Sequence, residues 1–237
     1  ELVKQHKDIN LHTRVPLLAT IVASLIENDY IPTTKAEIYQ HRLRLLLGDW
    51  DRVKGVRRTE ISPQIKFRFL KRLAYDVHSS ARPVRKRMFK KENMLETYNQ
   101  ALGIHGYRLD FDQLANELLV AAGVIVYEGD ENYSFGHLTF QEHLVGEYLA
   151  DNMQVKDIVS YLDNDWWDEP LKFYAGIKGD ITPLIDLCEE HEITVSLSDK
   201  LFDLVNFAPY TSAVAIECLA ESRKIGRTEK DVGPKSL

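Results

Sequence analysis

The chain has no phosphate-binding loop. The patterns G-x-x-x-x-G-K-[ST] and G-x-G-x-x-G do not occur in the 237 residues, and no glycine is followed directly by lysine. A loop that cradles nucleotide phosphates needs glycines that expose backbone N–H groups, a lysine for the phosphates, and a Ser or Thr for Mg²⁺. We therefore expect this chain by itself to be no enzyme, to hydrolyse no nucleotide and to hold no tightly bound cofactor.

Long apolar stretches and cysteines are also scarce. No run of about 18 apolar residues occurs, so the sequence predicts no membrane-spanning helix. Cys188 and Cys218 are the only two cysteines, which is too few for a disulfide framework. A reducing compartment suits them, and we predict a cytoplasmic protein. The chain begins at Glu1 without a basic and then apolar leader, so we interpret it as a piece of a longer protein.

Hydrolytic and metal-binding constellations are missing as well. G-x-S-x-G does not occur, and no Ser-His-Asp constellation can be argued. His137 and His143 are six residues apart, which places them on different faces of a helix, unlike the pair in H-E-x-x-H. Cys188 and His191 are close in sequence, but two further zinc ligands are lacking. The sequence therefore predicts no catalytic residue and no metal site.

What is present is an ordinary globular composition with an uneven charge. The chain is 44% hydrophobic and 28% charged, and its net charge of −6 gives no overall attraction to nucleic acid. Residues 82–91, "RPVRKRMFKK", are strongly basic, while residues 163–169, "DNDWWDE", are acidic. The basic run could contact phosphates or an acidic face of another domain, although a solvated surface is the favoured interpretation. Its cations are Arg82, Arg85, Lys86, Arg87, Lys90 and Lys91.

Helical patterns fill the first half of the chain. Residues 14–28 are predicted to form an apolar helix with Pro16 in its first turn. Residues 33–51 predict another helix, with Thr34 and Glu37 spaced as a capping box. Residues 61–80 begin afresh at Ser62 and Pro63. Shorter helices are expected over 92–104 and 110–123. The helix over residues 33–51 is expected to bury Ile38, Leu45, Leu46 and Trp50.

A hairpin and a further helix follow these helices. Residues 124–138 look like a hairpin, because 124–127 and 133–135 favour strand on either side of the turn "EGDEN". Thr139 and Glu142 predict a capping box for a helix that starts near Phe140. Three helices and a hairpin over residues 60–138 are the order of a winged helix. Short helices after Asp151 suggest stacked pairs. The fold class we predict is mainly α, with a winged helix and a small β-hairpin flanked by an N-terminal helical segment and a C-terminal stacked-helix region.

Four segments are predicted. Residues 1–57 are a helical segment, 58–152 a winged-helix domain with its closing helix, 153–222 a helical-repeat region, and 223–237 a flexible tail.

Three stretches together resemble the NACHT family of signal-transducing NTPases, which includes antiviral proteins and innate-immune receptors. "VPLLATIVASLIENDYIPTTKAEIYQHRLRLLLGDW" (15–50) resembles the helical segment behind the NTPase core. "YSFGHLTFQEHLVGEYLA" (133–150) resembles the motif that closes the winged helix. "DWWDEPLKFYAGI" (165–177) resembles the start of the superhelical region. The resemblance covers about residues 10–180 and lacks the NTPase core. His143 departs from it, because the family more often has an aromatic residue there.

The resemblance implies nucleotide-binding roles for two residues. His137 is implied to reach the β-phosphate of ADP, and Pro16 to lie against the adenine. A histidine bonded within the wing, and a proline that only opens a buried helix, are the alternatives. The cofactor implied for the full-length protein is ADP or ATP with Mg²⁺. The implied partners are the protein's own upstream NTPase core, further copies on activation, and a protein or viral trigger, with no membrane.

A second function remains open, that of a winged-helix nucleic-acid-binding regulator with a helical dimerisation region. Its recognition helix would need polar and basic side chains. The candidate, "FDQLANELLVAAG" (111–123), carries Asp112 and Glu117 but no lysine or arginine. That composition favours burial against protein over a nucleic-acid partner.

Overall fold

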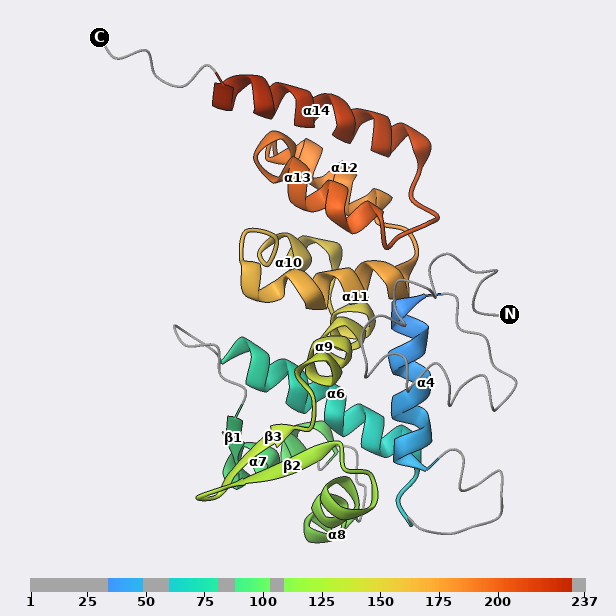
Figure 1. Cartoon of the computed structure of the whole chain (residues 1–237), viewed down its shortest axis with the longest axis vertical. Helices are drawn as coiled ribbons and strands as arrows, with labels where there is room; N and C mark the ends of the chain where they lie inside the picture. Colours follow the sequence, from blue (N-terminus) through green and yellow to red (C-terminus); the bar gives the residue numbers. More distant parts are fainter. Residues whose placement is uncertain (1–33, 49–59, 81–87, 103–108, 232–237) are drawn as a thin grey trace, which may run out of the picture. The chain divides into compact units, whose positions relative to one another are not determined.

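The computed structural model describes residues 34–48, 60–80, 88–102 and 109–231 (Figure 1). They form mainly helices with one small sheet, as the sequence predicts. The chain divides into two compact units, with the border between Tyr148 and Leu149. The predicted division into four segments stays a prediction.

The first described helix, α4 (Lys35–Leu47), has the predicted capping box. The Thr34 hydroxyl accepts from the Glu37 N–H at 3.2 Å, and the Glu37 carboxylate accepts from the Thr34 N–H at 3.3 Å. Gly48 ends the helix in the left-handed region, with φ 105°. The predicted buried stripe is partly wrong. Leu45 and Leu46 are half-buried, while the residues with least exposure are Ile38, Tyr39, Leu43 and Leu47.

Two helices follow at the predicted places. Helix α6 (Pro63–Ser79) begins at Ser62, whose hydroxyl accepts from the Ile65 N–H at 3.4 Å, with Pro63 in its first turn. Helix α7 (Lys91–Ala101) is shorter. Phe69, Leu73 and Val77 recur every four residues and are buried, which places one face of α6 in the core of the first unit.

The candidate recognition helix is not a uniform α-helix. Helix α8 (Phe111–Asn116) is capped by Asp110, whose carboxylate accepts from the Asp112 N–H at 3.0 Å. It continues into a π-turn, η2 (Glu117–Ala121), which the sequence does not predict. Gly123, with φ 61°, then reverses the chain toward the sheet.

The sheet has three antiparallel strands in the order β1-β3-β2. Strands β2 (Ile125–Gly129) and β3 (Asn132–Phe135) are the predicted hairpin, with Ile125 opposite Phe135. Strand β1 (Met88–Lys90) adds to the free edge of β3, with Phe89 opposite Tyr133, and was not predicted. Three helices and this hairpin make the winged helix that the sequence predicts.

Helix α9 (Leu138–Asn152) closes the winged helix and crosses the border between the units. It begins two residues earlier than expected. Thr139 therefore lies inside the helix, and the predicted capping box of Thr139 and Glu142 is wrong. Nearly every residue from Phe140 to Glu147 is buried, so this part of α9 lies in the core of the first unit.

The second unit consists of short stacked helices. They lie in successive layers: α10 with α11, then α12 with α13, then α14 (Figure 1). Helix α14 continues through Asp231, into the segment predicted as a tail. No helix in the described ranges is both long and apolar enough to cross a membrane. The bounds are α10 (Val155–Val159), η3 (Asp165–Trp167), α11 (Asp168–Lys178), α12 (Thr182–Glu190), α13 (Thr194–Val205) and α14 (Ala213–Asp231).

Candidate functional site

His137 lies at the joint between the last strand of the wing and helix α9. Strand β3 ends at Phe135 and α9 begins at Leu138, so only Gly136 and His137 separate them. The His137 side chain is exposed, as is Gly136. A ring buried in apolar surroundings would have excluded a sensing role, and the structure instead places this ring at the surface.

The ring is held in one orientation by the helix that follows it. The Thr139 N–H donates to His137 Nδ1 at 3.2 Å, and the Phe140 N–H donates to the His137 carbonyl at 3.0 Å. His137 is therefore the N-terminal cap of α9, a role usually taken by Asn, Asp or Ser. Because Nδ1 accepts a hydrogen bond, the proton of the neutral ring is on Nε2, which leaves an N–H donor on the far side of the ring from the helix.

Aromatic packing connects this ring to helix α4. The rings of His137 and Phe140 meet edge to face, with centroids 6.3 Å apart and an interplanar angle of 71°. Phe140 in turn meets Tyr39 of α4 edge to face, with centroids 5.9 Å apart. Tyr39 and Phe140 are both buried, so the histidine stands on the hydrophobic core and not on a mobile loop.

Behind the joint, a buried carboxylate joins three helices. Glu147 of α9 accepts from Gln40 of α4 at 3.3 Å and lies 3.2 Å from His143 Nε2 and 3.6 Å from Lys71 Nζ of α6. Burial raises the pKa of Glu147, but the hydrogen bond and charge of His143, the charge of Lys71 and the amide of Gln40 outweigh it, so the pKa lies below its ordinary value. Sequence reasoning missed this cluster, although the spacing of His143 and Glu147 by four residues is a detectable signal.

A second buried charge pair fixes the π-turn. Lys66 of α6 is fully buried, and its ammonium lies 2.7 Å from Glu117 Oε2 and donates to the Leu47 carbonyl at 3.2 Å. The other oxygen of Glu117 accepts from the backbone N–H groups of Glu60 and Ile61, at 2.8 and 3.3 Å. The end of α4, the start of α6 and the π-turn thus converge on one ion pair. The pairing of Lys66 with Glu117 could not be predicted from the sequence, because the two residues are far apart in the chain.

In a winged helix that reads DNA, the recognition helix and the wing would meet the DNA, and here neither α8 with the π-turn nor the β2–β3 hairpin contains a lysine or arginine. Along α8 and the π-turn, the exposed side chains include Asp112, Asn116 and Val120. The wing exposes Glu128, Asp130 and Glu131 around its tip. Acidic and apolar groups here oppose phosphate binding.

The basic run is only partly described. Lys90 donates to the Asp130 carbonyl at 2.7 Å, and Lys91 lies 3.0 Å from the Asp112 carboxylate. Both lysines therefore make contacts within the winged helix itself. Arg82, Arg85, Lys86 and Arg87 lie outside the described residues, and so does Pro16, whose adenine role stays a prediction.

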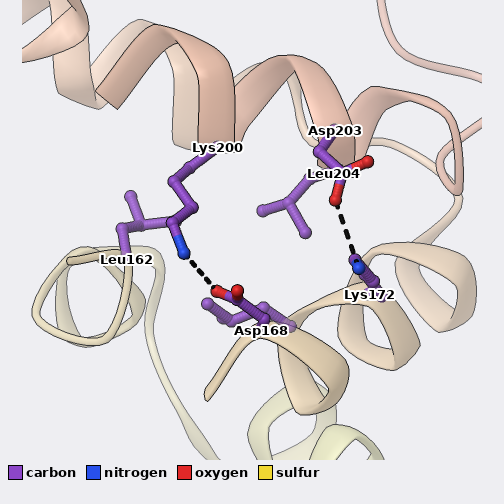
Figure 2. A pocket seen from close by; sticks show the side chains of 7 residues that line it. Leu162, Asp168, Lys172, Lys200, Asp203 and Leu204 are labelled. Carbon is purple, nitrogen blue, oxygen red and sulfur yellow. Dashed lines mark hydrogen bonds and ion pairs between the residues drawn. The ribbon is translucent and has the colours of Figure 1, made fainter. Parts of the chain in front are cut away.

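In the second unit, side chains of the acidic stretch (163–169) pack and pair with other residues of that unit. Trp167 is buried and stacks on Tyr161, with ring centroids 3.9 Å apart, so it belongs to the packing of the second unit. Figure 2 shows Lys200 of α13 reaching Asp168 of α11. The distance from Lys200 Nζ is 2.6 Å to Asp168 and 2.7 Å to Asp165.

The opposite pair, Lys172 of α11 with Asp203 of α13, spans 3.3 Å across the same hollow (Figure 2). Burial lowers the pKa of Lys172, but Glu169 and Asp203 outweigh burial and raise it. Leu162, Leu171 and Leu204 line the hollow. The charged side chains at its rim pair with one another across the hollow, and these ion pairs hold α11 and α13 together.

Cys188 belongs to the packing of the second unit. Its thiol is buried, and burial raises its pKa to about 11. A thiol that stays protonated is a poor metal ligand. No group of three His, Cys, Asp or Glu side chains that could hold a metal ion occurs within the described ranges.

Comparison with known proteins identifies the first unit. Residues 35–149 match the family described as the winged helix-turn-helix domain C-terminal to NACHT. No curated protein and no solved structure matches the chain. The matched range starts at the first residue of α4 and ends within α9, so it contains the three-stranded wing, the buried ion pairs and the His137 joint. Residues 35–149 are therefore similar to the winged helix-turn-helix domains that lie C-terminal to NACHT.

Proposed function

We propose that this chain is the nucleotide-responsive cover of a NACHT-type NTPase. A NACHT domain upstream binds ADP or ATP with Mg²⁺, and His137 donates its Nε2–H to the β-phosphate of ADP. The observation that carries the proposal is the exposed ring of His137, fixed by the Thr139 N–H at Nδ1 and so presenting a donor. Pro16 is assigned to the adenine by resemblance alone.

The energetics require more than this one contact. A hydrogen bond to a charged group contributes about 1.5–3 kcal/mol. Moving a two-state switch from mostly open to mostly closed takes about 5.5 kcal/mol of differential binding. Burial between the cover and the NACHT domain must supply the remainder. The cover is then a latch that ADP helps to close and that ATP exchange releases.

The wider role follows from the same assignment. In the open form the protein assembles with further copies of itself, and a protein or viral trigger acting through the C-terminal region favours that form. We assign it to cytoplasmic defence signalling. A nucleic-acid regulator is the less supported function, because the exposed face of α8 and the π-turn carries Asp112 and Val120 where cations would be needed.

The test uses the complete protein with its NACHT domain and compares two substitutions of one residue. His137→Ala removes both the helix cap and the phosphate donor. His137→Asn keeps a cap, since its side-chain oxygen can accept from the Thr139 N–H, but it cannot reach the phosphate. Both variants should release ADP about ten- to a hundredfold faster than the wild type and signal without a trigger.

His191→Ala is the matched control, because His191 is an exposed histidine of the second unit. It should retain ADP as the wild type does. If His137→Asn restores wild-type retention, the histidine acts only as a cap. If His137→Ala also retains ADP and stays silent, the latch assignment is removed.

A further inference from the structure

The joint that carries His137 rests on another part of the backbone. The Gly136 N–H donates to the Val124 carbonyl at 2.9 Å. A methyl group added at Gly136 would lie 3.0 Å from the Gly123 carbonyl oxygen and 3.3 Å from a γ-methyl of Val126. Carbon atoms in proteins rarely approach an oxygen so closely, so any side chain here must displace the joint or its neighbours.

Gly136 is required by this contact and not by its conformation. The left-handed glycines of the described residues are Gly48, Gly123, Gly129 and Gly179, and Gly136 is not among them. It is also exposed, so no packed core surrounds it. A close approach between two backbone segments is the remaining reason for glycine.

The backbone segment that Gly136 approaches, at Gly123 and Val124, is also held in a defined conformation. Gly123 takes φ 61°, which an L-residue adopts only with strain, and it follows the π-turn. The Val124 N–H donates to the Leu118 carbonyl at 3.2 Å, which connects this backbone segment to the π-turn. Glu117 of the π-turn is held by Lys66, so the segment that leads to Gly123 is anchored at its start.

We infer that Gly136 is a positioning residue for His137: its bare Cα rests on the Gly123 carbonyl and so sets where the imidazole Nε2 stands. The inference rests on the proposed function of His137. A hydrogen bond to phosphate tolerates only about 2.7–3.2 Å between donor and acceptor. A displacement of a few tenths of an ångström at Gly136, one residue away, is enough to leave that range.

The experiment measures the release of a fluorescent ADP analogue from the complete protein with its NACHT domain. Gly136→Ala and Gly136→Val add one and three carbons above the Gly123 carbonyl. Release should be faster by about threefold for Ala and about tenfold for Val, since a misplaced donor loses most of its bond. In the His137→Ala background neither should add a further increase, because the donor is already gone.

Gly226→Ala is the control for crowding alone. Its methyl group would lie 3.2 Å from the Val195 carbonyl oxygen, a contact of the same kind within the second unit. It should release the analogue at the wild-type rate, and thermal melts should show all variants folded. The milder Gly136→Ala keeps the test usable if Val prevents folding.

Two results overturn the inference while leaving the proposed function in place. One is wild-type release from both Gly136 variants when His137→Ala releases faster. The other is an equal acceleration by Gly136→Val with and without His137, which would make the effect a general loss of structure. If His137→Ala itself retains the analogue, the proposed function and this inference fail together.

Discussion

At the scale of single residues, two buried carboxylates are the unusual feature of the first unit. Glu117 and Glu147 are both buried, and each has a lysine of α6 beside it. Lys66 is the more extreme partner, since it has no exposed surface. A buried charge that loses its partner costs far more than the pair contributes when intact. These sites should therefore respond differently to single and double substitution.

Lys66→Met should lower the free energy of unfolding by about 3–5 kcal/mol, because Glu117 is left buried without a cation. Adding Glu117→Gln should restore part of the loss, since the neutral amide can still accept from the Glu60 and Ile61 N–H groups. Urea denaturation of the single and double variants measures both effects. A double variant less stable than Lys66→Met alone would show that the unpaired charge is not the cause.

The depressed pKa of Glu147 predicts a dependence on acid. A carboxylate whose folded pKa lies below the ordinary 4.5 stabilises the fold above that value, and its contribution is lost as pH falls through the folded pKa. Glu147→Gln removes that contribution, so its melting temperature should fall less between about pH 5 and pH 3 than that of the wild type. Parallel melting curves for the two proteins would contradict the assignment.

At the scale of elements, local signals predicted what local chemistry decides. The capping box of Thr34 and Glu37, the Ser62–Pro63 start and the β2–β3 hairpin all depend on residues a few positions apart. What was missed depends on distant partners. Strand β1 exists because β3 offers it an edge, and α9 starts early because the His137 side chain itself caps it. The site residue was predicted from resemblance, whereas its neighbours Gly123 and Gly136 required the fold.

The wing tip is an element that stores backbone strain. Asp130 and Glu131 have φ 49° and 59°, the conformation in which a two-residue hairpin turn favours Asn-Gly. Glu131→Gly should therefore raise the free energy of unfolding by about 1 kcal/mol. Glu131→Gln, which removes the charge but keeps the strain, should leave it unchanged. Thermal melts of the two variants separate conformation from charge, and an equal gain in both would assign the effect to charge.

At the scale of the whole molecule, the charge distribution favours protein over nucleic acid as the proposed partner. The net charge is −6, and the described face of α8, the π-turn and the wing adds acids and apolar groups where a DNA reader places cations. Two lysines that could have served, Lys90 and Lys91, contact Asp130 and Asp112 instead. The chain thus has the shape of a winged helix, but its candidate recognition helix and wing offer DNA phosphates few cations that are not already in contact with the chain itself.

This surface predicts that the chain does not bind duplex DNA even at about 50 mM salt, where phosphate contacts are strongest. An electrophoretic shift assay measures it. The matched variant replaces the exposed Asp112, Asn116 and Val120 with lysine, which places three cations where a recognition helix would meet the groove. That variant should gain a shift that disappears as salt is raised, because each cation that contacts a phosphate displaces a counterion. A salt-dependent shift by the unaltered chain would instead revive the nucleic-acid regulator.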